Sequence, residues 1–237
     1  MDALTNAKFL AGTQGRWIAS QGQYFKAMNG TPGSAITGPT TTSFSTTAAL
    51  FEVENSAPVN SNVFVYPDFV KLTIVGVDTT TAASTFNYCG VLDPILRFSS
   101  GGFQPISPET GPVNVLRMNN QGGATTMPQA NWHFGAIVLN TAGTNRLIMS
   151  RGVAKVGQTT ALTVAGDQYY FSFSPAYDVG AGAALSGTLP AIYRQNLGVV
   201  CVPPQSSFAL LTWYPNLTAA FTFELEAGWF EMPSYPA

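Results

Sequence analysis

Apolar and polar residues alternate along the C-terminal part of the chain. Residues 221–229 are apolar at every second position, with threonine, glutamate and glycine between them. A period of two predicts a β-strand with one buried and one solvent-facing side. The preceding segment, residues 206–214, is apolar on both sides, which indicates a strand inside a sandwich core. Because Pro215-Asn216 lies between the two segments, we predict that they form a hairpin with a short loop.

Similar strand-like segments occur along most of the chain, separated by clusters of Gly, Pro, Asn and Thr. No segment keeps a 3.6-residue apolar period with helix caps, so any helix should be short. The spacing of the strand-like segments is typical of an all-β protein. We predict a β-sandwich with a jelly-roll-like strand order. Residues 99–112 and 119–131 should be long loops that contact a partner or have another role. The further predicted strands are residues 63–66 and 69–75 on either side of Pro67-Asp68, 85–92, 133–139, 147–153 and 169–173.

The first 45 residues differ from the rest of the chain because they are rich in Gly, Ser and Thr but still contain aromatic residues. We predict an extended N-terminal arm at residues 1–45 and a sandwich domain at residues 46–237. In an arm that folds against a neighbouring subunit, Trp17, Tyr24 and Phe25 would be the partner-binding anchors. The alternative is that this segment forms a peripheral strand pair of the same domain, and the sequence leaves both interpretations open.

Charged residues make up only 9% of the sequence, against roughly a quarter in a typical soluble domain. Low charge favours association, because little repulsion keeps copies apart. The net charge of -2 and the scattered basic residues argue against nucleic-acid binding. No window approaches the roughly 18 apolar residues that a membrane helix needs, and we expect no secretory signal. Cys89 and Cys201 lie in apolar runs, where two buried thiols are favoured over a disulfide.

The residue types that carry catalysis are sparse. His133 is the only histidine, and its aromatic neighbours indicate a packed core or rim residue. Glu224 and Glu226 fall on one side of a predicted strand, where a solvated outer face is a simpler interpretation than a pair of catalytic acids. Asp167 and Asp178 lack the clustered acidic loop of a calcium site. We therefore predict no catalytic, cofactor-binding or metal-binding residues, and no enzymatic activity.

Eight segments carry a resemblance to a known family, namely residues 15–18, 24–27, 47–55, 66–72, 151–153, 166–169, 202–208 and 223–231. In these segments the chain resembles tailed-bacteriophage virion structural proteins of the capsid decoration or cement type. The resemblance implies a non-enzymatic protein that is made in the host cytoplasm and ends on the capsid surface. It also implies that the partners are the major capsid protein and further copies of the chain itself, as a homotrimer. None of the matching segments is a catalytic motif.

Other function classes remain open from the sequence. A receptor- or carbohydrate-binding module of a tail fibre would need aromatic side chains on one exposed face, and Trp132, Trp213 or Tyr214 could provide them. A jelly-roll major capsid protein of a tailless phage is a second alternative, and an enzyme is a third. A description of which surfaces are covered by other chains would separate these classes.

Overall fold

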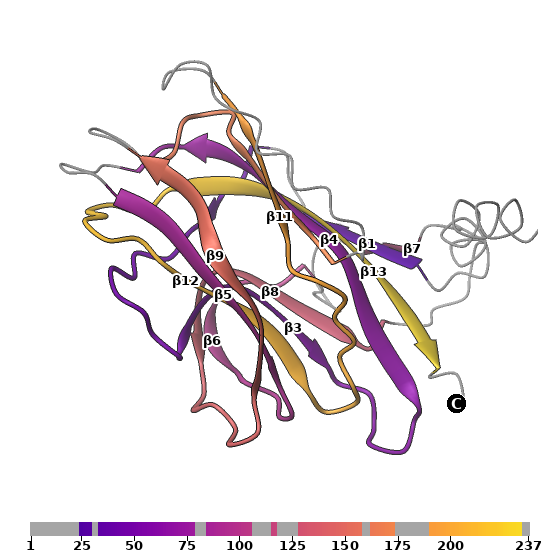
Figure 1. The fold of residues 1–237 in the computed structure, drawn as a ribbon. Coiled ribbons are helices and arrows are strands. Elements are labelled where there is room, and N and C mark those ends of the chain that lie inside the picture. The colour runs from indigo at the N-terminus through magenta and orange to yellow at the C-terminus, as the bar shows by residue number, and fades with distance from the viewer. Residues whose placement is uncertain are drawn as a thin grey trace, which may run out of the picture.

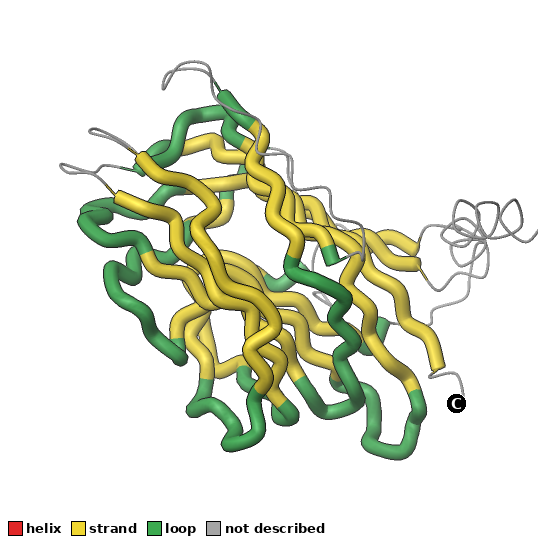
Figure 2. The backbone as a smooth tube through the Cα atoms, in the orientation of Figure 1, coloured by secondary structure: helices red, strands yellow, loops and turns green. Residues whose placement is uncertain are grey.

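The chain folds into two layers of β-strands (Figure 1). The computed structural model describes residues 24–29, 33–78, 84–105, 115–117, 128–157, 162–173 and 190–233. Strands and connecting loops account for all of these residues, and none of them is in a helix (Figure 2). The predicted all-β sandwich is therefore confirmed, whereas the jelly-roll-like strand order stays a prediction.

One layer is a seven-stranded sheet in the order β11-β10-β4-β13-β1-β7, with β2 paired to β13. The paired strands are antiparallel except β10 and β11, which are parallel. The strands are β1 (Tyr24–Met28), β2 (Ile36–Thr37), β4 (Val63–Gly76), β7 (Val115–Arg117), β10 (Gln168–Ser172), β11 (Ile192–Asn196) and β13 (Thr222–Pro233).

The other layer is a six-stranded antiparallel sheet in the order β6-β8-β3-β12-β5-β9. Strands β6 and β9 form its two edges. The predicted loop at residues 99–112 begins as strand β6. The strands are β3 (Ala48–Asn55), β5 (Ser84–Asp93), β6 (Phe98–Phe103), β8 (Ala130–Leu139), β9 (Leu147–Gly157) and β12 (Ser207–Trp213).

Aromatic side chains from both sheets fill the space between the layers. Phe51 lies 5.6 Å from Phe171 of the opposite sheet, and Trp132 lies 5.7 Å from Trp229, measured between ring centroids. All four of these side chains are fully buried. Large rings at van der Waals distance give close packing and bury much apolar area per residue. This core fixes the two sheets face to face.

Strand β12 is buried on both of its faces, as its apolar sequence predicts. Phe208 and Leu210 face the main core, whereas Ala209 and Leu211 belong to a second apolar cluster on the outer side of the six-stranded sheet. Strands β3 and β5 occupy both edges of β12. A strand in this central position leaves no edge for the segment that follows it.

The predicted hairpin between residues 206–214 and 221–229 is wrong for this reason. Strand β13 pairs with β4, β1 and β2 in the opposite sheet and not with β12. The connection crosses from one layer to the other, with Tyr214, Leu217 and Phe221 buried along it. Asn216 adopts a left-handed backbone conformation with φ of 65°, which helps the chain to turn within a few residues.

The predicted break at Pro67-Asp68 is bridged, and β4 runs through it without interruption. Pro67 pairs with Trp229, directly beside a register shift of β13 between Gly228 and Trp229. A bulge accommodates a proline because it removes the need for a regular ladder hydrogen bond at that position. The two predicted segments are therefore one long strand.

The described part of residues 1–45 belongs to the sandwich. Strand β1 pairs with β13 on one side and β7 on the other, and β2 pairs with β13. Further along, the amide of Tyr214 donates to the carbonyl of Thr41 at 2.8 Å. Residues 24–29 and 33–45 are therefore part of the sandwich domain, with strands β1 and β2 among them. Residues 1–23 lie outside the described residues, so an arm there stays a prediction.

Candidate functional site

The three predicted partner-binding anchors have different positions. Phe25 is only 4% exposed and stacks on Trp229 with ring centroids 5.7 Å apart, so it is a core residue. Tyr24 is half-buried, and its hydroxyl donates to Asp68 Oδ2 at 2.9 Å. Trp17 lies outside the described residues. The structure thus places Phe25 where a partner cannot reach it, and the anchor role of Trp17 and Tyr24 stays a prediction.

The aromatic residues that could have formed a sugar-binding platform do not share an exposed face. Trp132 and Tyr214 are fully buried. Trp213 is half-buried, and Phe44 packs edge-on against it at 5.3 Å. A platform for a sugar needs exposed ring faces. These residues therefore serve packing in the described sandwich.

His133 belongs to a buried polar cluster on the outer side of the six-stranded sheet. Strand β3 contributes Glu52 and Glu54, and β5 contributes Asp93. Arg97 follows β5 and is fully buried, with Nη1 placed 3.6 Å from Asp93 Oδ2. The segment 94–98 covers the carboxylates, so the sequence prediction of a packed His133 is confirmed.

Several directed contacts hold this covering segment on the sheet. Arg97 Nη2 donates to the carbonyl of Asn140 at 2.8 Å. The amide of Phe98 donates to Glu54 Oε1 at 2.8 Å, and the Phe98 ring stacks on His133 with centroids 3.5 Å apart. Hydrogen bonds to charged groups are the stronger class of such bonds in proteins. These contacts fix the C-terminal end of the covering segment on the sheet.

Burial controls the charge of the cluster. It raises the pKa of Glu52 to about 8, with the negative charge of Glu54 acting in the same direction. It also lowers the pKa of His133 to about 4, so the imidazole is neutral at pH 7 and its 4.0 Å approach to Glu54 is not an ion pair. Both groups are closed to solvent. A substrate in solution cannot reach them in this arrangement.

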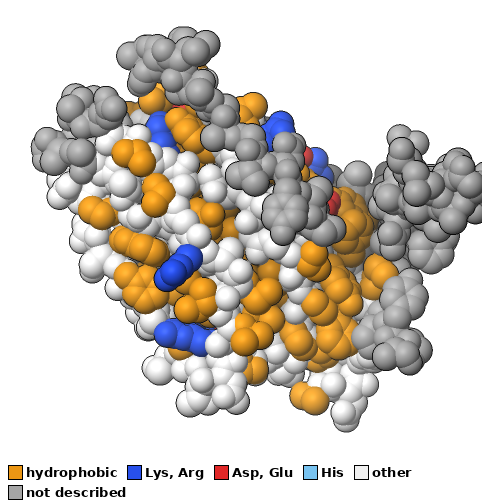
Figure 3. Space-filling model, viewed as in Figure 1, with side chains coloured by type: hydrophobic (Ala, Val, Ile, Leu, Met, Phe, Trp, Pro, Cys, Tyr) orange, Lys and Arg blue, Asp and Glu red, His pale blue; other side chains and the backbone are white. Residues whose placement is uncertain are grey.

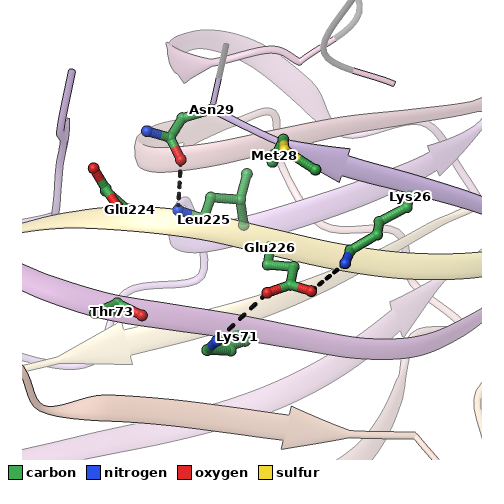
Figure 4. Close-up of a pocket in the computed structure, with 8 residues that line it drawn as sticks. All are labelled: Lys26, Met28, Asn29, Lys71, Thr73, Glu224, Leu225 and Glu226. Carbon is green, nitrogen blue, oxygen red and sulfur yellow. Dashed lines mark hydrogen bonds and ion pairs between the residues drawn. The ribbon is translucent and has the colours of Figure 1, made fainter. Parts of the chain in front are cut away.

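Glu224 and Glu226 line a groove of about 270 Å³ on the outer side of the seven-stranded sheet (Figure 4). Glu226 lies between Lys26 and Lys71, with Lys71 Nζ 3.4 Å from Glu226 Oε2. The hydrogen bond from Lys26 is the main cause that lowers the pKa of Glu226. Glu224 Oε1 accepts a hydrogen bond from the amide of Gly33 at 2.7 Å. The two carboxylates share one solvated face, as predicted, and each has partners within the chain.

Asp167, Asp178 and the two cysteines are the remaining candidates for metal or redox chemistry. Asp167 is buried and accepts hydrogen bonds from Lys155 at 2.6 Å and from the amide of Ala191 at 3.0 Å. Asp178 lies outside the described residues. In the described ranges, no group of three or more His, Cys, Asp or Glu side chains could hold a metal ion. Cys89 and Cys201 are free thiols.

Strand β9 has more exposed large hydrophobic residues than any other strand of the six-stranded sheet. It has 11 residues and forms the outer edge of that sheet. In Figure 3, hydrophobic side chains on the face occupied by β9 and β5 are interspersed with uncharged surface and with Lys or Arg side chains. An exposed edge strand usually carries charges, proline or a cover that prevents pairing with other chains. The exposed apolar residues of β9 are Leu147 at 59%, Ile148 at 63%, Met149 at 37%, Val153 at 48% and Val156 at 66%.

The sequence did not identify this edge or the buried acids as candidate sites. The run Leu147-Ile148-Met149 is a visible apolar signal, but it predicts only a strand. Its exposure depends on which strand ends the sheet. Glu52 occupies an alternating position that normally indicates a solvated face, and segment 94–98 buries it.

Comparisons of the chain with protein-family models, curated proteins and solved structures found no match. The part of the chain that the structure describes contains no helix with the length and apolarity needed to cross a membrane.

Proposed function

We propose that this chain is a non-enzymatic virion structural protein that binds the surface of a phage capsid and stabilises the shell. The observation that supports this proposal best is the exposed apolar edge strand β9 on a surface with little charge. Exposed apolar patches on soluble proteins mark sites of association, and protein shells offer many equivalent sites for one small subunit. The partners are the major capsid protein and further copies of the chain, arranged as a homotrimer.

The mechanism is mass action. A protein that binds only the mature shell lowers the free energy of that shell by RT ln(1 + [L]/Kd), which is a few kcal/mol per site when its concentration far exceeds Kd. Apolar area and backbone hydrogen bonds supply the affinity, because charged groups are scarce. Summed over many seams between capsid subunits, this term opposes the pressure of packaged DNA.

Particles assembled with and without the chain provide the test. We expect depleted particles to form but to release their DNA at a lower temperature than complete particles. Adding back the wild-type protein should restore the release temperature, whereas Ile148→Lys should restore it poorly, because a lysine at this edge disfavours apolar contact. Val59→Lys is the matched control, since Val59 is 73% exposed on the loop between β3 and β4.

A different outcome would favour a receptor-binding module. Depleted particles could release DNA at the normal temperature and yet fail to adsorb to host cells. The polar groove around Asn29, Thr73 and Glu226 is the feature that supports this second function, because its amide, hydroxyl and charged groups suit a polyhydroxylated ligand. Variants that remove Lys26 and Lys71 would then lose adsorption and keep capsid binding.

A further inference from the structure

We infer that the free edge of β9 receives an extended, acid-bearing strand of a partner protein, which adds to the six-stranded sheet. The inference rests on the proposed function in taking β9 as the contact surface. It goes further in naming the geometry of the contact and the chemistry of the partner segment. Strand addition of this kind uses backbone hydrogen bonds for affinity and side chains for selectivity.

The backbone of β9 has one occupied and one open edge. Within the described ranges, β9 pairs with β5 alone, from Leu147 opposite Leu92 to Gly157 opposite Ser84. Its C-terminal half is fixed to the other layer, because Lys155 forms an ion pair with Asp167 at 2.6 Å and lies 5.0 Å from the centre of the Tyr193 ring. The N-terminal half therefore offers the accessible stretch for a new strand.

The side chains of β9 form an apolar row on the outer side of the sheet. Ile148 is paired with Val91, which belongs to the outer apolar cluster. Val153 is opposite Asn87 and Val156 is opposite Thr85, on the same side of the sheet as Ile148. Arg151 and two register shifts of the β5–β9 ladder interrupt this row. Directly opposed apolar side chains on adjacent strands contribute about 0.2–1 kcal/mol per pair. A partner strand with apolar residues on this side, except opposite Arg151, would extend the row.

The only exposed charge on β9 is positive. Arg151 is exposed and opposite Cys89. Burial raises the pKa of the Cys89 thiol, while the positive charges of Arg146 and Arg151 act in the opposite direction, which places both guanidinium groups near this point of the sheet. A cross-strand carboxylate opposite Arg151 would be favourable, and a cross-strand lysine would be unfavourable.

A second copy of this chain does not supply that carboxylate from its described residues. Five of the described acids, at positions 52, 54, 78, 93 and 167, are buried. The other four lie on β4 or β13, and none is exposed. Asp68 accepts from Tyr24, Glu224 from Gly33, Glu226 from Lys71, and Glu231 from Gln129. On the described residues, charge complementarity therefore points to a segment of a different protein.

Binding of short labelled peptides to the purified full chain tests the inference. The probe is a peptide of alternating valine and threonine with glutamate at its centre, compared with the same peptide carrying lysine there. We expect fluorescence polarisation to show about tenfold tighter binding of the glutamate peptide, in line with one favourable against one unfavourable cross-strand pair. Arg151→Glu should reverse this preference, and Val59→Glu, which adds a negative charge on a distant loop, should leave it unchanged.

Backbone pairing has its own control. A glutamate peptide with N-methylated amides on one edge cannot donate ladder hydrogen bonds and should bind at least tenfold more weakly if it adds as a strand. Equal binding of the methylated peptide, no detectable binding of either charged peptide, or an unchanged preference in Arg151→Glu would each overturn the inference. So would a wild-type dimer that Ile148→Lys converts to a monomer, because a second copy would then occupy the edge.

The peptide experiment and the particle experiment can fail independently, so their outcomes distinguish strand addition from the capsid role. Glutamate-peptide binding together with unaltered stability of depleted particles would refute the capsid role and leave strand addition in place. Less stable depleted particles, together with no peptide binding, would support the capsid role and refute strand addition at β9.

Discussion

Glu52 is a carboxyl group that the sandwich encloses completely. Both of its oxygens are without a hydrogen-bond partner among the described residues, although Ser207 lies beside it and donates its hydroxyl hydrogen to the carbonyl of Ile95 at 2.9 Å. An ionised carboxylate in such a place would be costly, so the protonated form is favoured. At this scale, one side chain links the stability of the fold to pH.

The burial of Glu52 predicts how the stability of the fold changes with pH. The pKa of Glu52 is about 8 in the folded chain, against 4.5 for an ordinary glutamate. Its contribution to stability is therefore complete below pH 4.5 and is lost as the pH rises through 8. We expect Glu52→Gln to be more stable than the wild type at pH 8 by on the order of a few kcal/mol, and to differ much less at pH 4.5.

Urea unfolding of both proteins between pH 4.5 and 8.5 measures this difference. Comparing the variant with the wild type cancels the opposite contribution of His133, whose neutral form favours folding above pH 6.5 and whose contribution is lost as the pH falls through 4. A stability difference that stays constant with pH would show that Glu52 does not titrate in this range.

At the scale of elements, strand β1 connects the N-terminal segment to the core of the sandwich. It lies between β13 and β7, and its inward residues Phe25 and Ala27 are buried. The sequence suggested an arm because this segment is surrounded by Gly, Ser and Thr. The short run at residues 24–28 nevertheless alternates, and pairing with β13 buries its inward side.

Replacing Phe25 tests this structural role. We expect Phe25→Ala to lower the free energy of unfolding by about 3–5 kcal/mol, because it removes a buried ring that stacks on Trp229. Tyr24→Phe is the neighbouring control and should cost about 1 kcal/mol through the lost hydrogen bond to Asp68. Thermal or urea unfolding measures both. Unchanged stability of Phe25→Ala combined with lost partner binding would restore Phe25 as an anchor.

At the scale of the whole molecule, charge is unevenly distributed. The described acids are buried or lie on β4 and β13, while the exposed edge at β9 is apolar and bears Arg151. A surface of this kind has little repulsion to keep copies apart, and the sequence pI is about 5.3. The free chain should therefore precipitate readily at high concentration when no partner covers this edge, without forming a defined dimer through it.

Solubility provides the corresponding prediction. We expect the purified chain to have its lowest saturation concentration near its pI. Ile148→Lys should raise that concentration severalfold at neutral pH, because it places a second exposed charge on the edge strand. Light scattering during stepwise concentration measures it. Val59→Lys adds the same charge elsewhere, so an equal gain from Val59→Lys would attribute the effect to net charge and not to the β9 edge.

The sequence alone determined that the chain is all-β, and it located those strands that have a clear local pattern of apolar and polar residues. The alternation at residues 221–229, the doubly apolar run at 206–214 and the packed His133 were read correctly, because each depends on a local period and on side-chain polarity. Only the tertiary structure decided which strands are neighbours. It separated β12 from β13, placed β9 at an edge and buried Glu52 under segment 94–98. Strand partners are selected by contacts between residues far apart in the chain, and no local pattern records those contacts.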